Sequence, residues 1–115
     1  MTDDSSCVKV VRWEGQVAIV ELTGEIDLHR APAVHKALLG ACEKKPTQLV
    51  IDMIEVSYLD SSGIGVLVEV FRRTNAYGGQ FKLSGVGQRV RSVFEITRLD
   101  KFFKIFPTVA EALAS

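Results

Sequence analysis

The sequence has few cysteines and no long apolar run. Only two of its 115 residues are cysteines, Cys7 and Cys42, which is too few for a disulfide scaffold or a cysteine-based zinc cluster. No apolar run approaches the ~18 residues of a membrane-spanning helix. Residues 1–6 have neither a basic start nor an apolar stretch, so they predict no secretory signal. We therefore expect reduced thiols in a cytoplasmic protein with no membrane partner.

An excess of charge of one sign is also absent. Lys and Arg together number 14, as do Asp and Glu, so the formal net charge is zero. This balance removes the simplest case for direct nucleic-acid binding. Residues 1–60 nevertheless carry ten acidic and six basic side chains, whereas residues 61–115 carry four and eight. The asymmetry fits a chance distribution over a solvated surface, and it also fits a polarised surface that orients a protein partner.

What is present is the composition of one ordinary globular domain, 47% apolar and 24% charged. Short apolar runs alternate with helical periodicities. The predicted strands are 8–13, 16–22, 48–53, 81–84 and 102–106, and the predicted helices begin at Ala31, cover 61–76, include 90–97 and follow Thr108. We therefore predict a single α/β domain, residues 1–115 with a core of about 8–114. Its mixed β-sheet is flanked by helices in the order ββαβαβαβα.

Several boundaries follow from local signals. Glu14-Gly15 predicts a hairpin turn between the first two strands, and Thr23-Gly24 is expected to end the second. Lys44-Lys45-Pro46 closes the first helix, and Thr108 with Glu111 forms a capping-box pattern before the last one. The helix 61–76 is apolar on most sides, so we expect it to be deeply packed.

One segment, Leu59-Asp60-Ser61-Ser62-Gly63-Ile64-Gly65-Val66, carries more polar chemistry than packing requires. It joins a buried strand to a helix, and a helix N-terminus attracts anions through its unpaired N–H groups. In structural terms Asp60 or Ser61 is a helix cap, and the glycines allow close packing. However, Gly63 and Gly65 in the first turns each lower helix stability by about 1 kcal/mol relative to alanine. A single helix cap also needs only one of the two serine hydroxyls. Bare backbone beside hydroxyls would also let a macromolecule approach closely.

Enzyme motifs do not fit this segment. A nucleophile elbow needs a glycine two residues before the serine, which is missing, and nothing in the sequence places His29 or His35 near Ser61. The dinucleotide fingerprint fails because Val68 stands at its third glycine position, and no Gly-Lys-Ser/Thr phosphate loop occurs. The two histidines lie six residues apart, which is unsuitable for a metal site on one helical face. We therefore expect no catalytic residue, no cofactor and no metal, and we expect the serine to be a substrate for a kinase.

The segments Gly24-Glu25-Ile26-Asp27 and Asp60-Ser61-Ser62-Gly63-Ile64-Gly65 together resemble the anti-sigma factor antagonists of the STAS domain family. The resemblance covers about residues 8–114 and implies a STAS-like fold. It implies a protein that is not an enzyme. The unphosphorylated form would bind an anti-sigma factor that is also a GHKL-type serine kinase, which would free the sigma factor. Phosphorylation would release the antagonist, and a serine phosphatase would reset it.

The resemblance also implies roles for individual residues. Ser61 matches the phosphoacceptor, Asp60 precedes it, Asp27 lies near it, and Ser62 takes a mainly structural position. The residues that match the partner-binding motif are Glu25, Asp27, Asp60, Ser62, Gly63 and Gly65. We expect the surface around Asp27, Asp60 and Gly63 to dock near the nucleotide site of the kinase.

Other roles within the same family remain open at this point. Some STAS domains are accessory or scaffold subunits of stress-sensing or lipid-transport complexes, and a small-molecule-binding module is a further alternative. An intact serine at position 61 favours the phosphorylation switch. A gene for a GHKL ATPase beside the gene for this chain would separate the switch from these alternatives.

Overall fold

The computed structural model describes residues 7–115, so the expectation about a signal in residues 1–6 lies outside the described part. It contains a five-stranded sheet in the order β1-β2-β3-β4-β5, in which β1 is antiparallel to β2 and the other neighbours are parallel. The elements are β1 (Val8–Glu14), β2 (Val17–Ile26), α1 (Ala31–Glu43), β3 (Gln48–Leu59), α2 (Ser61–Ala76), β4 (Gln80–Ser84), α3 (Gln88–Ile96), the 3-10 turn η1 (Leu99–Lys101), β5 (Lys104–Phe106) and α4 (Val109–Ala114). The predicted mixed sheet and element order are therefore confirmed.

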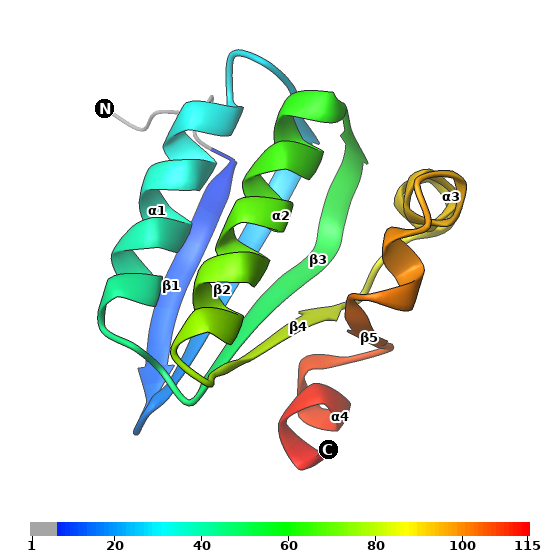
Figure 1. The fold of residues 1–115 in the computed structure, drawn as a ribbon. Coiled ribbons are helices and arrows are strands. Elements are labelled where there is room, and N and C mark those ends of the chain that lie inside the picture. The colour runs from blue at the N-terminus through cyan, green and yellow to red at the C-terminus, as the bar shows by residue number, and fades with distance from the viewer. Residues whose placement is uncertain (1–6) are drawn as a thin grey trace.

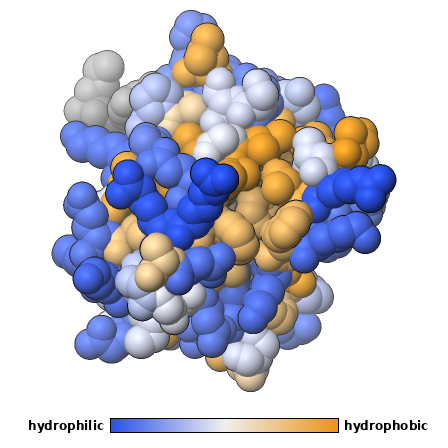
Figure 2. All heavy atoms as spheres, in the orientation of Figure 1, coloured by the Kyte–Doolittle hydropathy of each residue, from blue (hydrophilic) through white to orange (hydrophobic). Residues whose placement is uncertain are grey.

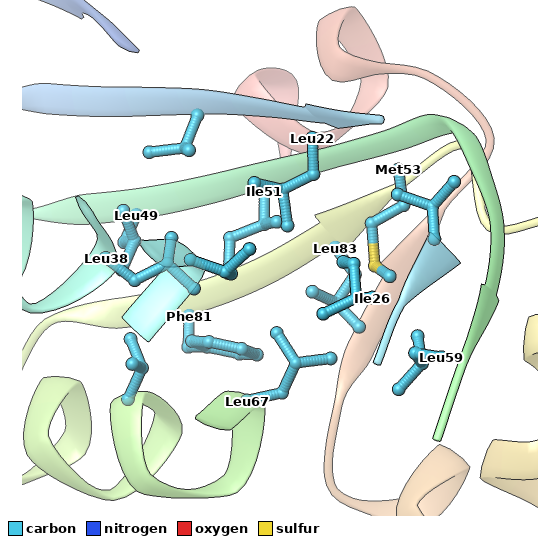
Figure 3. Close-up of a cluster of buried hydrophobic side chains, with 14 of the residues drawn as sticks. Leu22, Ile26, Leu38, Leu49, Ile51, Met53, Leu59, Leu67, Phe81 and Leu83 are labelled. Carbon is cyan, nitrogen blue, oxygen red and sulfur yellow. The ribbon is translucent and has the colours of Figure 1, made fainter. Parts of the chain in front are cut away.

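The sheet is covered unequally on its two faces. Helices α1 and α2 lie side by side over one face (Figure 1), where they enclose the main apolar core. Figure 3 shows this core, whose labelled side chains are Leu22, Ile26, Leu38, Leu49, Ile51, Met53, Leu59, Leu67, Phe81 and Leu83. On the opposite face a smaller cluster forms where α4 packs Ala112 against Ile19 of β2 and Val50 of β3. The main core thus holds the two helix starts that follow β2 and β3 in fixed positions.

A buried lysine fastens α4 to this second face. The side chain of Lys82 on β4 is fully buried, and its Nζ donates hydrogen bonds to the Ala112 carbonyl at 2.7 Å and to Gln48 Oε1 at 2.8 Å. Further bonds reach the carbonyl and hydroxyl of Ser115. Burial lowers the pKa of the Lys82 ammonium, and the nearby charge of Lys104 lowers it further. A cation among the last carbonyls of a helix satisfies groups that the helix itself leaves unpaired.

The two central strands are longer than the sequence predicts. Strand β2 continues through Thr23 and Gly24 to Ile26, and β3 continues to Leu59 instead of ending at residue 53. Their pairing survives two register shifts, and Gly24 adopts φ +81° at one of them. Bulges of this kind extend and bend a strand where a local turn signal would suggest its end. The hairpin turn also lies one residue later than predicted, at residues 15–16.

Two expectations are wrong, one about the burial of α2 and one about the start of the last strand. Helix α2 has the predicted bounds, but its Ile64, Val68 and Phe71 remain partly exposed because α2 is an outer layer that buries only one face. The predicted strand 102–106 is shortened to residues 104–106 by η1. There the buried Phe103 packs edge-on against Phe71 and Phe94, at 5.4 Å between ring centroids in both cases. That aromatic packing outweighs the local strand preference.

Candidate functional site

Two neighbouring parallel strands bring the motif residues together at one edge of the sheet. Ile26, the last residue of β2, pairs with Leu59, the last residue of β3. The Asp60 N–H donates a hydrogen bond to the Ile26 carbonyl at 3.2 Å, which ties the two strand ends together. Helices α1 and α2 both start from this edge (Figure 1). Asp27 and Asp60, 33 positions apart in the chain, therefore follow adjacent strand ends.

Asp60 is the N-cap of α2. Its Oδ1 accepts hydrogen bonds from the Ser62 N–H at 2.8 Å and from the Gly63 N–H at 3.3 Å. Its backbone is extended, with φ −98° and ψ −169°, as an N-cap residue requires. The capping role that the sequence left open between Asp60 and Ser61 thus belongs to Asp60. A carboxylate already fills the anion-attracting position at the start of this helix.

Ser61 is the first residue of α2 and is exposed, whereas Ser62 is half-buried. Within residues 7–115 neither hydroxyl has a hydrogen-bond partner. Because no base contacts the Ser61 hydroxyl, nothing in the described chain activates it as a nucleophile. His35, which the sequence could not place, pairs through Nε2 with Glu69 of α2 at 2.8 Å, two helical turns beyond Ser61. The Ser61 hydroxyl therefore lies at the surface without a hydrogen-bond partner among the described residues.

The two glycines of the segment have different surroundings. Gly63 is buried, and a Cβ at this position would lie 3.0 Å from Leu59 Cβ and 3.1 Å from the Ile26 carbonyl oxygen. Gly63 therefore lets α2 pack directly on the strand ends, and the expectation that it offers open surface to a partner is wrong. A Cβ at Gly65 would meet nothing within 4 Å. Gly65 is exposed and follows Ser61 by one turn on the same helical face.

Asp27 organises the start of α1. Its Oδ1 accepts hydrogen bonds from the backbone N–H groups of His29 and Arg30, both at 3.0 Å, and its Oδ2 pairs with Arg30 Nη1 at 2.8 Å. Desolvation acts to raise the pKa of the Asp27 carboxyl, but the hydrogen bonds and the charge of Arg30 outweigh it. The net result is a pKa below its usual value, so this carboxylate is a fixed anion at neutral pH.

The remaining parts of this edge are Glu25 and an apolar residue that the motif analysis missed. Glu25 is exposed on β2 opposite Tyr58, and its backbone carbonyl accepts a hydrogen bond from the buried Cys7 thiol at 3.4 Å. Leu28 follows Asp27 and is 67% exposed. Its only sequence signal is an apolar residue between charged and polar neighbours in a short loop. Exposed apolar side chains beside a binding motif are typical of protein interfaces.

The edge as a whole combines the carboxylates of Asp27 and Asp60 with the exposed Ser61, whose hydroxyl has no partner among the described residues. The Asp60 carboxylate caps α2, and the Asp27 carboxylate binds the N–H groups of the turn that precedes α1. Across residues 7–115 no group of three or more His, Cys, Asp or Glu side chains could hold a metal ion. No helix among the same residues is long and apolar enough to cross a bilayer. Both cysteines are buried and unpaired in the described chain.

Comparison with known proteins gives a consistent answer. The model of the STAS domain family matches residues 9–112. The anti-sigma-B factor antagonist of Bacillus subtilis is 36% identical over 86 residues, which cover 75% of this chain and 78% of the relative. The anti-sigma-F factor antagonist RsfB of Mycobacterium tuberculosis is 34% identical over 110 residues, or 96% of this chain and 88% of the relative.

A solved structure from the same class of proteins has a similar fold. The crystal structure of an anti-sigma factor antagonist from Mycobacterium paratuberculosis matches with a TM-score of 0.85 at 30% identity, covering 99% of this chain and 97% of that one. These relatives are regulatory binding proteins rather than enzymes. The motif residues, the sheet topology and the match over residues 9–112 lead to one conclusion: the chain belongs to the STAS domain family.

Proposed function

We propose that this chain is an anti-sigma factor antagonist controlled by phosphorylation of Ser61. In its unphosphorylated form it binds an anti-sigma factor that is also a GHKL-type serine kinase, and the bound sigma factor is released. Phosphate on Ser61 weakens that complex, and a serine phosphatase restores it. The relatives named above as antagonists of anti-sigma factors support the first part of the proposal. The unpaired, buried thiols support a cytoplasmic setting.

The single observation that carries the phosphorylation step is the Ser61 hydroxyl. It is exposed at the first position of α2 and has no hydrogen-bond partner in the described chain, so a kinase reaches it without unfolding the helix. Ser62, by contrast, is half-buried, and its N–H is held by the Asp60 cap. We therefore assign the phosphoacceptor to Ser61 and a structural position to Ser62.

The caps explain why a phosphate here acts as a switch. A phosphate near a helix N-terminus is usually stabilised by free N–H groups. The Ser62 and Gly63 N–H groups already bind the Asp60 carboxylate, so the new charge is added beside an existing anion. A phosphate carries about −1.5 to −2 charge at neutral pH. A partner surface shaped for a hydroxyl would have to desolvate that charge, which strongly disfavours the complex.

The test uses the purified chain, ATP and each GHKL-type kinase encoded in the same genome. Intact-mass measurement should show the addition of one phosphate, and fragmentation should assign it to Ser61. Ser61→Ala should abolish the mass increase, while the matched variant Ser62→Ala should retain it. Phosphate found on Ser62 alone, or outside residues 57–65, would contradict the assignment. A chain that binds none of these kinases would favour the accessory-subunit role instead.

A further inference from the structure

An apolar groove lies between α2 and residues 99–103, which include η1. It is separate from the motif edge, by which we mean the end of the sheet where β2 and β3 stop at Ile26 and Leu59 and α1 and α2 follow. Figure 2 shows apolar surface gathered there in a hollow, with hydrophilic surface on both sides. The hollow has a volume of about 240 Å³. Its lining is Val68, Phe71, Arg72, Leu99, Phe102 and Phe103. Phe102 is 62% exposed and joins the other apolar lining residues in one contiguous apolar surface.

The groove floor is formed by packed aromatic rings. Phe71 packs edge-on against Phe81 at 5.5 Å and against Phe103 at 5.4 Å between ring centroids. A second, smaller hollow of about 90 Å³ also has Phe71 and Phe102 in its lining, and reaches Gln80 and Lys104. The two hollows are therefore neighbours that share Phe71 and Phe102 in their linings. Two adjacent hollows can accept two apolar side chains that are spaced one turn apart on a helix.

The charged residues that line the two hollows are of one sign. The residues that line the two hollows include two cations, Arg72 and Lys104, and no carboxylate. Within residues 7–115 neither cation forms an ion pair. The lysine and arginine of this rim thus face solvent without a counter-charge, although the whole chain is electrically neutral. An occupant with carboxylates beside its apolar anchors would supply the missing partners.

We infer that this groove binds an acidic amphipathic helical segment of a partner protein, with two apolar anchors one turn apart and carboxylates toward Arg72 and Lys104. The hollow is smaller than the roughly 300–1,000 Å³ of pockets that enclose small molecules, but it fits side chains. The groove is a concave hollow whose lining includes cations but no carboxylate, which suits an acidic helix better than a flat lipid surface. The inference goes beyond the proposed function because it requires no modification of Ser61.

The location makes a single extended partner feasible. Val68 follows Ser61 by seven residues on the same face of α2, a distance of about 10 Å along the helix. One protein could therefore cover the motif edge and the groove together. The groove would then contribute affinity that does not depend on the phosphorylation state of Ser61.

The probe is a synthetic 16-residue amphipathic peptide with leucines at four-residue spacing and glutamates on its other face, and the matched peptide carries lysines in place of the glutamates. Titrations followed by amide chemical shifts should show that the acidic peptide binds at least tenfold more tightly, with shifts centred on residues 68–72 and 99–104. Phe102→Ser should weaken binding at least tenfold. Ile96→Ser, which removes an apolar side chain that is 82% exposed outside the groove, should leave it unchanged.

Two further arms keep the result specific. Arg72→Glu should reverse the preference between the acidic and basic peptides, whereas Lys36→Glu on exposed α1 surface should not. Ser61→Asp should leave peptide binding within twofold, so failure here is separable from failure of the phosphorylation switch. Equal binding of both peptides would overturn the inference. So would Phe102-dependent binding to phosphatidylglycerol vesicles without peptide binding, or a Phe102-dependent dimer of the free chain.

Discussion

Residues at the motif edge have different structural roles, and single substitutions can test each role separately. Asp60 and Asp27 hold helix starts, Gly63 allows contact between α2 and the strands, and Ser61 remains free. Packing and partner binding are therefore assigned to neighbouring positions. The clearest contrast is between the two glycines, because one is enclosed and the other open.

Gly65→Arg should block the partner without harming the fold. Position 65 is open, and replacing a helical glycine contributes up to ~1 kcal/mol of helix stability. We expect unfolding free energy equal to or above wild type, with kinase affinity at least tenfold lower by calorimetry. The matched control is Gly40→Arg on α1, where a Cβ also meets nothing within 4 Å and which should bind normally. Equal affinity of Gly65→Arg and wild type would place the docking surface elsewhere.

At Gly63, in contrast, we expect a larger side chain to destabilise the fold. A side chain there pushes on Leu59 and Ile26, and overpacking of this kind costs roughly 1–3 kcal/mol or more. Gly63→Arg should therefore lower the unfolding free energy measured by denaturant, and any loss of binding would follow from misfolding. A stable Gly63→Arg variant would contradict the close packing described above.

The bonds of the Asp27 carboxylate to the turn before α1 predict a pH dependence of stability. Its folded pKa is below the usual value near 3.8, so its contribution to stability is complete above that pH. As the pH falls below 3.8 toward the folded pKa, the contribution is lost. Asp27→Asn should thus be less stable than wild type at pH 7, with the difference shrinking at pH 3. Thermal unfolding at both pH values measures this difference, and a difference that does not change with pH would argue against a stabilising role for the Asp27 carboxylate.

At the scale of secondary-structure elements, α4 is the part most dependent on one interaction. Lys82 supplies the hydrogen bonds to the last turn of this six-residue helix. Lys82→Met should keep the apolar stem but remove these bonds. We expect a loss of roughly 1.5–3 kcal/mol, the value of one hydrogen bond to a charged group. Amide exchange should rise in residues 109–114 while β2 and β3 remain protected; uniform protection would show that apolar packing alone holds α4.

The elements also show which features sequence reasoning can reach. The bounds of α2 follow from a strong cap signal at Asp60 and the glycine pair after Tyr77, both of which are local. The extension of β3 to Leu59 depends on a partner strand more than 30 residues away, and bulges conceal it. The same holds for Gly63, because its neighbours Ile26 and Leu59 meet only after folding. The motif could be found from sequence, but its division into buried and open positions could not.

At the scale of the whole molecule, the switch should be local. Phosphate on Ser61 repels Asp60 by about 3 kcal/mol per pair of unit charges at ~6 Å and an effective dielectric of ~20, before screening by solvent and salt. A domain stability of ~5–15 kcal/mol absorbs this repulsion, whereas tenfold weaker binding needs only ~1.4 kcal/mol. Ser61→Asp should therefore weaken kinase binding at least tenfold, while Ser61→Ala binds constitutively.

The backbone should change by less than ~1 Å between the two forms. Amide chemical shifts of the phosphorylated and free chains should differ only within residues 24–30 and 57–68. Differences that extend through α3 and α4 would indicate a conformational mechanism and contradict a charge switch.

The strand order β1-β2-β3-β4-β5 has a consequence for how the chain reaches this structure during synthesis. Every strand pairs with the one made immediately before it, so no strand has to insert between two others that are already joined. Growth of the sheet can follow translation, which proceeds at roughly 5–20 residues per second and favours folding of early segments first. The β1–β2 hairpin can form quickly, whereas each of the three parallel pairs must wait for the helical segment that joins its two strands, so the later pairings are slower. The motif edge is complete once α2 has emerged, before the groove residues of η1 have been synthesised.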